Sequence, residues 1–534
     1  MPNLNAATLE STEQTYLTPA VEEIHSLTAA GRFGEALALV RDELARNPGD
    51  RELLFARGCT LFDWGRVWEA RNAFLLAKER GLSRASLFLN LSLSCTMLGL
   101  SEEAERHVRS AIAIDPDSVH AHFGLGSILQ GMERFDEAIA SYLVALELVP
   151  DSAHCLTNIS ACRYGQHDYV GAEDYARRAL AIEPNRPQAL DNLGIALAGQ
   201  ERHAEGLEAL KRAAEAEATL RFNGVSFVNY GYALILTGQA RAAKEFHRRN
   251  LPSVPDPRVH RQYAFALLTL GHLSEGWTQH EFRWYEEPGL SKRPKLVQPP
   301  WVGQDLAGKT ILLRPEQGAG DIIQFARFAV PLKKMGATVI LSVPEELKDM
   351  SEGFTGVDEV VLLSMPVPAF DYHISVMSIP AVLGTELATI PVDVPYLRVD
   401  AAQSERWRAR IGGRGLKVGL AWAGNPAHLR DCYRSLPFEL LERLWEIPDV
   451  QYFSLQKQPR PGEVEKFPPE FRLIDLGTKF ENFGDTAAAI AQLDLVICVD
   501  TAVAHLAGAL GKPVWVMLPE IGDIAGGYDF QGLQ

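Results

Sequence analysis

The chain has 534 residues, of which 47% are hydrophobic and 22% are charged, and its formal net charge is -16. Such an acidic chain does not fit a nucleic-acid-binding protein, which needs basic stripes to neutralise phosphates. The length is too great for a single hydrophobic core and predicts several structural units.

Residues 1–18 show no basic start followed by an apolar run, so no signal peptide is predicted, and we expect this segment to be disordered. No uninterrupted apolar stretch of about 18 residues occurs, so no membrane span is expected. The cysteines are scattered, without a C-x-x-C pair or a zinc-binding spacing. This pattern predicts free thiols in a reducing cytoplasm and no metal site.

A period of 34 residues organises residues 19–285 into a repeat array. One series of small residues keeps this period through Ala36, Ala70, Ala104, Ala138, Ala172 and Gly206. A second series, earlier in each unit, runs through Gly58, Ser92, Gly126, Ser160 and Gly194. Small residues let the two helices of a unit approach closely, which repeat arrays require. The pattern resembles the tetratricopeptide repeat and predicts an α-solenoid of about eight units.

Four asparagines recur at equivalent positions of the repeats: Asn90, Asn158, Asn192 and Asn229. Because equivalent positions stack, we expect these amides to form a line along the inner surface. An amide can both donate to and accept from the backbone of an extended peptide. The line is similar to the asparagines that hold the acceptor polypeptide in repeat-containing protein O-GlcNAc transferases. The alternative is that asparagine is simply common at this position of such repeats.

The end of the array and the segment after it are marked by a change in composition. In "EGWTQHEFRWYEE", Trp277 and Trp284 are expected to close the apolar end of the array against the next domain. Residues 286–309 are rich in proline and glycine without a period, which predicts a linker.

Strands then alternate with helices, including an amphipathic helix expected over residues 436–447. This alternation predicts parallel sheets covered by helices. The pattern restarts once, so we expect two consecutive Rossmann-like halves, residues 310–412 and 413–534.

The first chemically informative stretch is "EQGAGD", which follows a predicted strand. Gly318 and Gly320 permit a tight turn and the close approach of a ligand beside Gln317. Asp321 would lie at the start of the next helix and project into the cleft, where it could remove a proton from an acceptor hydroxyl. The alternative is that Asp321 only caps the helix.

The second stretch is "GLAWAGNPAHLRDCYRSLP". A turn at Gly424 and Asn425 is followed by His428, Arg430 and Arg434, which suggest a diphosphate site because arginine matches phosphate oxygens. The alternative is that these arginines pair with surface acids. Gln456, which ends the predicted strand "QYFSLQ", is a further predicted cleft residue.

The third stretch is "CVDTAVAHLAGALGKPVWVMLP". Its strand would deliver Asp500 and Thr501 to the carboxyl edge of the sheet, where open α/β folds bind ligands. The backbone N–H groups of Thr501, Ala502 and Val503 would begin a helix and suit a phosphate, and His505 lies one turn further on. The alternative is that Asp500 and Thr501 only cap this helix while His505 is packed.

Together these motifs resemble bacterial glycosyltransferase family 9, the heptosyltransferase-like group, in the branch fused to N-terminal repeats. The resemblance implies a GT-B fold with no metal and no cofactor besides the nucleotide-sugar substrate. It implies that Asp321 is the general base, and that Arg434, Asp500, Thr501, Ala502 and His505 hold the donor phosphates. Two positions depart from the family motif, since Ala502 replaces a glycine and Arg434 a lysine. The family continues with further elements after "LP", so the second half is expected to be truncated.

The resemblance implies inverting transfer of a sugar from a nucleotide sugar to a hydroxyl of a protein or glycan. The repeats would bind the acceptor or a partner. The alternative is a non-catalytic repeat scaffold whose transferase domain has decayed. A nucleotide-sugar epimerase with a similar two-domain layout fits the repeats poorly.

Overall fold

A computed structural model of the chain describes residues 18–220, 224–254, 256–286, 296–424, 435–457 and 473–518. The chain forms two compact units, residues 1–221 and 222–534. Of the segment expected to be disordered, residues 1–17 lie outside the described residues. Within the described ranges, no helix combines the length and the apolar composition needed to cross a membrane.

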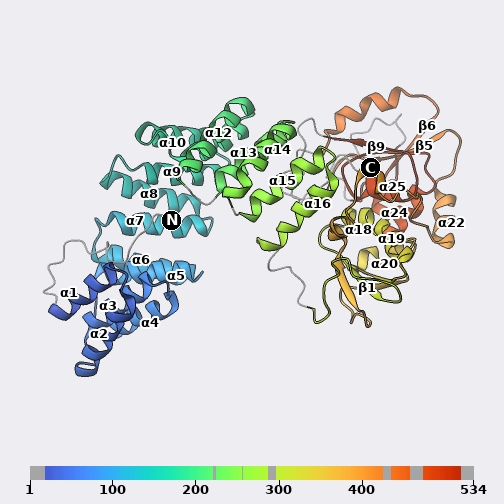
Figure 1. The fold of residues 1–534 in the computed structure, drawn as a ribbon. Helices are drawn as coiled ribbons and strands as arrows, with labels where there is room; N and C mark the ends of the chain where they lie inside the picture. The colour runs from blue at the N-terminus through green and yellow to red at the C-terminus, as the bar shows by residue number, and fades with distance from the viewer. Residues whose placement is uncertain are drawn as a thin grey trace. The chain divides into compact units, whose positions relative to one another are not determined.

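The first unit is built from helices that pack in consecutive antiparallel pairs, coloured blue to teal in Figure 1. Its helices are α1 (Pro19–Ala29), α2 (Phe33–Arg46), α3 (Arg51–Asp63), α4 (Val67–Glu79), α5 (Ala85–Met97), α6 (Ser101–Ile114), α7 (Val119–Gly131), α8 (Phe135–Leu148), α9 (Ala153–Gly165), α10 (Tyr169–Ile182), α11 (Pro187–Gly199) and α12 (His203–Leu220). The predicted helical repeat region is confirmed.

Close approach between paired helices explains the small residues of the period. A Cβ atom added to Gly126 in α7 would lie 2.7 Å from the ring of Tyr142 in α8. A Cβ atom added to Gly206 in α12 would lie 2.7 Å from the backbone oxygen of Gly194 in α11. Both distances are too short for a side chain, so the small residues of the 34-residue period lie where paired helices are in contact.

The second unit begins with four more repeat helices, α13 (Val225–Leu236), α14 (Ala240–Asn250), α15 (Pro257–Thr269) and α16 (Leu273–His280), followed by the 3-10 turn η3 (Glu281–Tyr285). Trp277 of α16 packs edge-on against Phe325, with ring centroids 5.4 Å apart. Buried residues of α15 and α16 join one continuous core with both sheets described below. The expectation that Trp277 closes the array against the next domain is therefore confirmed.

The first sheet has four parallel strands in the order β3-β2-β1-β4. Its elements are β1 (Thr310–Arg314), α18 (Ala319–Phe325), η4 (Ala326–Phe328), α19 (Ala329–Lys334), β2 (Thr338–Val343), η5 (Glu345–Leu347), α20 (Lys348–Ser351), β3 (Glu359–Leu362), β4 (Tyr372–Ser375), η6 (Val376–Ser378), α21 (Ile379–Val382) and η7 (Leu387–Thr389). Because β2 and β4 flank β1 on opposite sides, the chain reverses direction across the sheet between β1 and β4. Open α/β folds bind ligands at the carboxyl ends of strands at such a switch point.

The second sheet has five parallel strands in the order β7-β6-β5-β8-β9. Its elements are α22 (Ala401–Arg410), β5 (Leu416–Ala421), η8 (Phe438–Glu446), β6 (Val450–Ser454), β7 (Leu473–Asp475), η10 (Gly477–Lys479), α24 (Phe483–Ile490), β8 (Leu495–Val499), α25 (Ala502–Ala509) and β9 (Val514–Met517). The switch point here lies between β5 and β8. Two parallel α/β sheets in succession after a helical repeat region agree with the predicted solenoid and GT-B fold.

One detail differs from the expected layout. The α-helix expected over residues 436–447 is made of 3-10 turns, η8. Pro437 precedes η8 as its N-cap residue, and Ile447, which comes before Pro448, is extended, so the segment ends at Glu446. The helix α22 packs against α24, where Trp407 donates a hydrogen bond to Asp485 at 3.0 Å.

A buried histidine in the second unit leads to a pH prediction. Neither ring nitrogen of His247 in α14 has a hydrogen-bond partner among the described residues, and burial lowers its pKa from 6.5 to about 3. Below pH 6.5 the unfolded chain therefore takes up a proton that the folded chain resists. We expect the free energy of unfolding to fall by about 1.4 kcal/mol per pH unit from this group as the pH drops from 6.5 towards 3.

Urea unfolding between pH 7 and pH 5 measures this slope. In the His247→Leu variant, the free energy of unfolding should depend less on pH, by about the 1.4 kcal/mol per pH unit that one proton contributes. Replacing the exposed His120 by Leu serves as the control and should leave the slope unchanged. An unaltered slope in His247→Leu would show that His247 is protonated in the folded protein.

Candidate functional site

The predicted base, Asp321, lies in the first turn of α18, just after the loop that leaves β1. Its Oδ2 atom accepts a hydrogen bond from the backbone N–H of Gly318 at 3.1 Å, and the residue is 8% exposed. This carboxylate therefore caps the start of α18, as the alternative interpretation expected. Capping occupies one oxygen of the carboxylate and does not by itself decide whether Asp321 also takes a proton. Gln317 lies in the same loop, half-buried.

The predicted donor motif lies at the carboxyl end of β8, beside the end of β5. Asp500 is 5% exposed, and Thr501 is the N-cap residue of α25 in extended conformation. The Thr501 side chain makes no capping hydrogen bond, and its Oγ1 atom is buried without a partner among the described residues. A buried hydroxyl without a partner at a helix N-terminus is a ready donor for an anionic ligand.

His505 lies one turn into α25 and faces the loop that carries Asp321. A Cβ atom added to Gly320 would lie 2.9 Å from His505 Cδ2 and 3.7 Å from Ala502 Cα, so only glycine fits there. Burial lowers the pKa of His505 and Arg327 lowers it further, against the opposing charge of Asp500. The imidazole is thereby held neutral and retains one ring N–H to donate.

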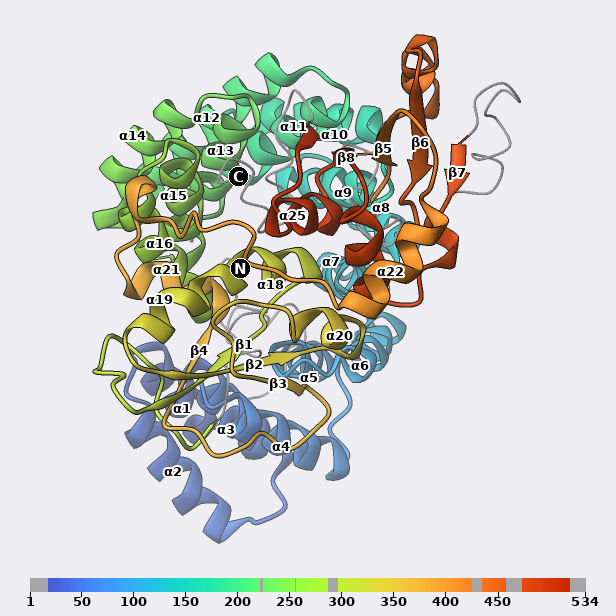
Figure 2. The same ribbon diagram turned by 90° about the vertical axis from the view of Figure 1, so that its right-hand side faces the viewer.

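The first and third motifs are thus brought together, because α18 and α25 pack against each other (Figure 2). In the second motif, the backbone N–H of Gly424 donates to Ser435 Oγ at 3.1 Å. The Oε1 atom of Gln456 accepts from the backbone N–H of Ala423 at 3.2 Å, so Gln456 braces the end of β5 at the switch point. The other predicted residues of this motif lie outside the described residues: Asn425, His428, Arg430 and Arg434.

The asparagine line occupies the expected helices, but its amides make contacts within the repeats. Asn90 is 1% exposed, and its Nδ2 atom lies 3.8 Å from Cys59 Sγ. Asn158 donates to the Tyr142 hydroxyl at 3.2 Å, and Asn192 donates to the backbone oxygen of Thr157 at 2.8 Å. Asn229 is half-buried in α13 of the second unit. The amides of Asn90, Asn158 and Asn192 thus already join neighbouring helices.

A potential metal-binding group lies in the first unit and consists of Cys95, Glu103 and His107, whose ligand atoms fall within 4.8 Å of one another. Arg71 Nη2 lies 2.6 Å from Glu103 Oε1 and so occupies the carboxylate that a cation would need. Desolvation raises the pKa of the Cys95 thiol, which disfavours the thiolate that binds metals. This group is better described as an ion pair packed beside a thiol.

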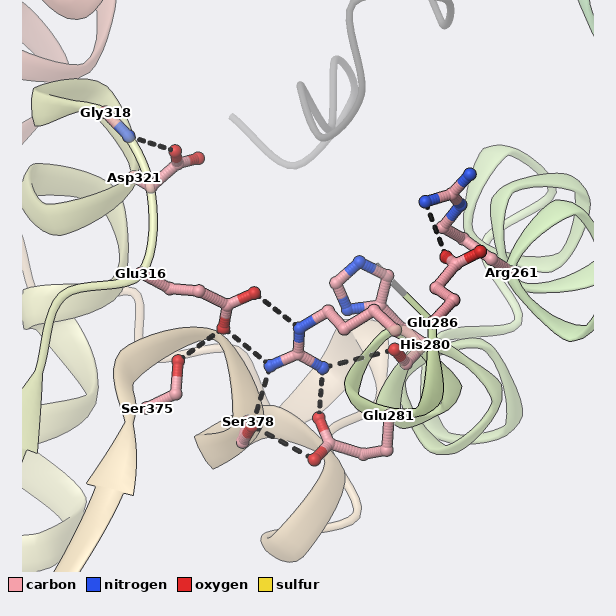
Figure 3. A network of polar contacts seen from close by, with 10 residues as sticks. Arg261, His280, Glu281, Glu286, Glu316, Gly318, Asp321, Ser375 and Ser378 are labelled. Carbon is pink, nitrogen blue, oxygen red and sulfur yellow. Dashed lines mark hydrogen bonds and ion pairs between the residues drawn. The ribbon is translucent and has the colours of Figure 1, made fainter. Parts of the chain in front are cut away.

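Sequence reasoning missed one buried polar network, which surrounds the guanidinium of Arg283 in η3. Figure 3 labels its other members, Glu281, Glu316, Ser375 and Ser378. Arg283 is 2% exposed and pairs with Glu316 through two bonds, Nε to Oε1 at 2.6 Å and Nη2 to Oε2 at 2.7 Å. It also contacts Glu281 at 2.5 Å and Ser378 Oγ at 2.8 Å, while Ser375 Oγ donates to Glu316 at 2.5 Å. Burial opposes its charge, but the two glutamates raise the pKa of Arg283 above its ordinary value.

Two sequence features could have indicated this network. Arg283 lies inside the aromatic run "EFRWY", and Glu316 is the first residue of "EQGAGD". A buried arginine needs carboxylate partners, yet the two partners are far apart in sequence and no period links them. The interpretation of this run as a purely apolar closure was therefore incomplete.

Comparisons with known proteins agree with this architecture. A sequence model of glycosyltransferase family 9 (heptosyltransferase) matches residues 463–516, which run from before β7 into β9 and contain the Asp500–His505 segment. A tetratricopeptide-repeat model matches residues 21–81 and 98–153. The chain is therefore a helical-repeat protein with a C-terminal α/β domain. It carries tetratricopeptide repeats followed by a C-terminal glycosyltransferase family 9 domain.

Among characterised proteins, the chain is 30% identical over 299 residues to Protein FlbA of Caulobacter vibrioides (strain ATCC 19089 / CIP 103742 / CB 15). The match covers 50% of this chain and 49% of FlbA, so the chain spans about half the length of this relative. A tetratricopeptide repeat protein from Parabacteroides merdae ATCC 43184 is 12% identical with a TM-score of 0.40, covering 46% of this chain and 97% of that one. MamA from Desulfovibrio magneticus RS-1 is 20% identical with a TM-score of 0.28, and the match covers 32% of this chain and 94% of that one.

Proposed function

We propose that this chain transfers a sugar from a nucleotide-sugar donor to a hydroxyl group of a protein or glycan acceptor, without a metal and with inversion. The observation that carries the proposal is the buried Thr501 hydroxyl, which has no partner among the described residues and lies at the N-terminus of α25. This position is the switch point of the second sheet and falls inside the segment that matches the glycosyltransferase family.

In this mechanism the donor diphosphate binds at the start of α25, where backbone N–H groups and the helix dipole favour negative charge. Thr501 and the neutral His505 ring each donate a hydrogen bond to it. These donors stabilise the leaving diphosphate as its charge grows. Asp321, on the adjacent helix α18, removes the proton of the acceptor hydroxyl, which then attacks the anomeric carbon directly and inverts it.

The substrate side of the proposal is tested by titrating the full chain with ADP-, GDP- and UDP-sugars by calorimetry and by assaying release of the nucleoside diphosphate. Saturable binding of one donor, followed by turnover with an acceptor, supports the proposal. Absence of saturable binding for every donor would instead favour a repeat scaffold without transferase activity.

The Thr501→Val variant gives a site-specific prediction. Valine matches the shape of threonine but lacks the hydroxyl, so donor binding is expected to weaken about tenfold or more, the value of a hydrogen bond to a charged group. Without ligand, the variant is expected to be at least as stable as the parent, because it removes a buried polar group that lacks a partner. Thermal unfolding with and without donor measures both effects. A destabilised variant with unchanged donor affinity would show that Thr501 is structural.

A further inference from the structure

The switch point of the first sheet is occupied by a side chain that comes from outside the sheet. Glu316 follows the end of β1, and Ser375 ends β4, so the two residues mark the carboxyl ends of the two strands that flank the switch point. Arg283 reaches this position from η3, directly after the last repeat helix, and it bonds to Glu281, Glu316 and Ser378, which Figure 3 labels.

The contact is directional as well as charged. The guanidinium binds the Glu316 carboxylate through both nitrogens of one edge, and Ser375 fixes the carboxylate from the β4 side. The side chain of Glu316 is 10% exposed and that of Arg283 is 2% exposed. A planar fork on a carboxylate sets orientation as well as distance, which a lysine or an apolar pair cannot do.

The anchored carboxylate belongs to the loop that carries the proposed base. Glu316 opens the stretch "EQGAGD", Gly318 donates its backbone N–H to Asp321 Oδ2, and α18 begins at Ala319. The loop between β1 and α18 is short, so a displacement of Glu316 displaces the cap and, with it, the Asp321 carboxylate. Trp277 against Phe325 holds the far end of α18 to the same repeat.

We propose that Arg283 is a positioning residue through which the end of the repeat array fixes the loop at residues 315–321 and thereby sets the place of Asp321. This inference rests on the proposed function for its effect on turnover. Buried ion pairs are weak sources of net stability compared with apolar pairs of the same volume. The Arg283–Glu316 pair at this buried position therefore points to a role in the geometry of the loop.

The test separates positioning from stability by comparing Arg283→Met with the double variant Arg283→Met/Glu316→Gln. The single variant leaves a buried carboxylate without its cation and should have a lower Tm. The double variant removes that charge and should recover most of the lost Tm. Its kcat should nevertheless stay about 100-fold below the parent value, with the donor KM within about twofold, because a misplacement near 1 Å has this cost.

The matched control is Arg261→Met, which breaks the ion pair of Arg261 with Glu286 at 2.5 Å in the same part of the second unit without touching the loop. It should leave kcat within about twofold of the parent value. Recovery of kcat together with Tm in the double variant would overturn the inference and make the pair purely structural.

A second readout does not depend on turnover. Hydrogen exchange of peptides covering residues 315–325 should be faster in the double variant than in the parent and in Arg261→Met. Unchanged exchange would overturn the inference even if the enzyme is active. Faster exchange in a protein that turns over no nucleotide sugar would keep the inference about the loop while the proposed function fails.

Discussion

Replacing Asp321 by asparagine is expected to reduce turnover of the nucleotide sugar by about 10²- to 10⁴-fold, the usual contribution of a general base. Asparagine keeps an oxygen that can accept the hydrogen bond from the Gly318 N–H, so the cap of α18 is preserved while the proton acceptor is lost. Single-turnover rates with saturating donor and acceptor measure the effect. The donor affinity and the Tm should stay close to those of the parent.

Asp321→Ala is the informative companion because it removes both the base and the cap. It should lose the same activity and, in addition, about 1 kcal/mol of stability from the missing cap. If Asp321→Asn kept activity within about threefold while Asp321→Ala lost stability, the side chain would be a helix cap only, and the base would have to lie elsewhere.

The second large effect is expected at Trp277, where truncation to alanine should destabilise the second unit by about 3–5 kcal/mol. The indole is 1% exposed. It packs edge-on against the rings of Phe325 and His280, with ring centroids 5.4 and 5.7 Å away. It also lines a small apolar cavity with Leu273 and Phe328. Removing it leaves a void between the last repeat and the first sheet. Urea unfolding followed by circular dichroism measures the loss.

Trp64→Ala is the matched control in the first unit. This indole is 46% exposed and makes a stacked contact with Phe33 at 6.0 Å and a cation–π contact with Arg66 at 5.4 Å. Its removal should cost about 1 kcal/mol or less. Equal losses in the two variants would contradict a shared core between the repeats and the sheet.

Periodic features of the sequence predicted most of the fold. The 34-residue period located the helix pairs because the small residues lie where backbones meet, as at Gly126 and Gly206. Alternating strands located both sheets, since buried parallel strands are short apolar runs. The amphipathic pattern over residues 436–447 predicted an α-helix where the structure has 3-10 turns, because apolar spacing in a short segment does not distinguish the two.

The candidate site was predictable only in parts. Strand ends identified Asp321 and Thr501, because the carboxyl edges of parallel sheets bind ligands. The sequence could not predict that Gly320 and His505 touch, or that Asn90 turns towards Cys59, since both depend on packing between distant segments. Arg283 was missed for the same reason: its partners Glu316 and Ser378 are distant in sequence and form no repeat with it.

The close approach of Gly320 to His505 has a thermodynamic consequence. No side chain separates the turn that holds Asp321 from the helix that would bind the donor phosphates, so a ligand that shifts one element acts directly on the other. Linkage then makes the effect reciprocal: the factor by which a bound donor changes acceptor affinity equals the factor by which a bound acceptor changes donor affinity. A single glycine thus couples the two substrate sites, and equilibrium titrations performed in both directions should give the same coupling factor.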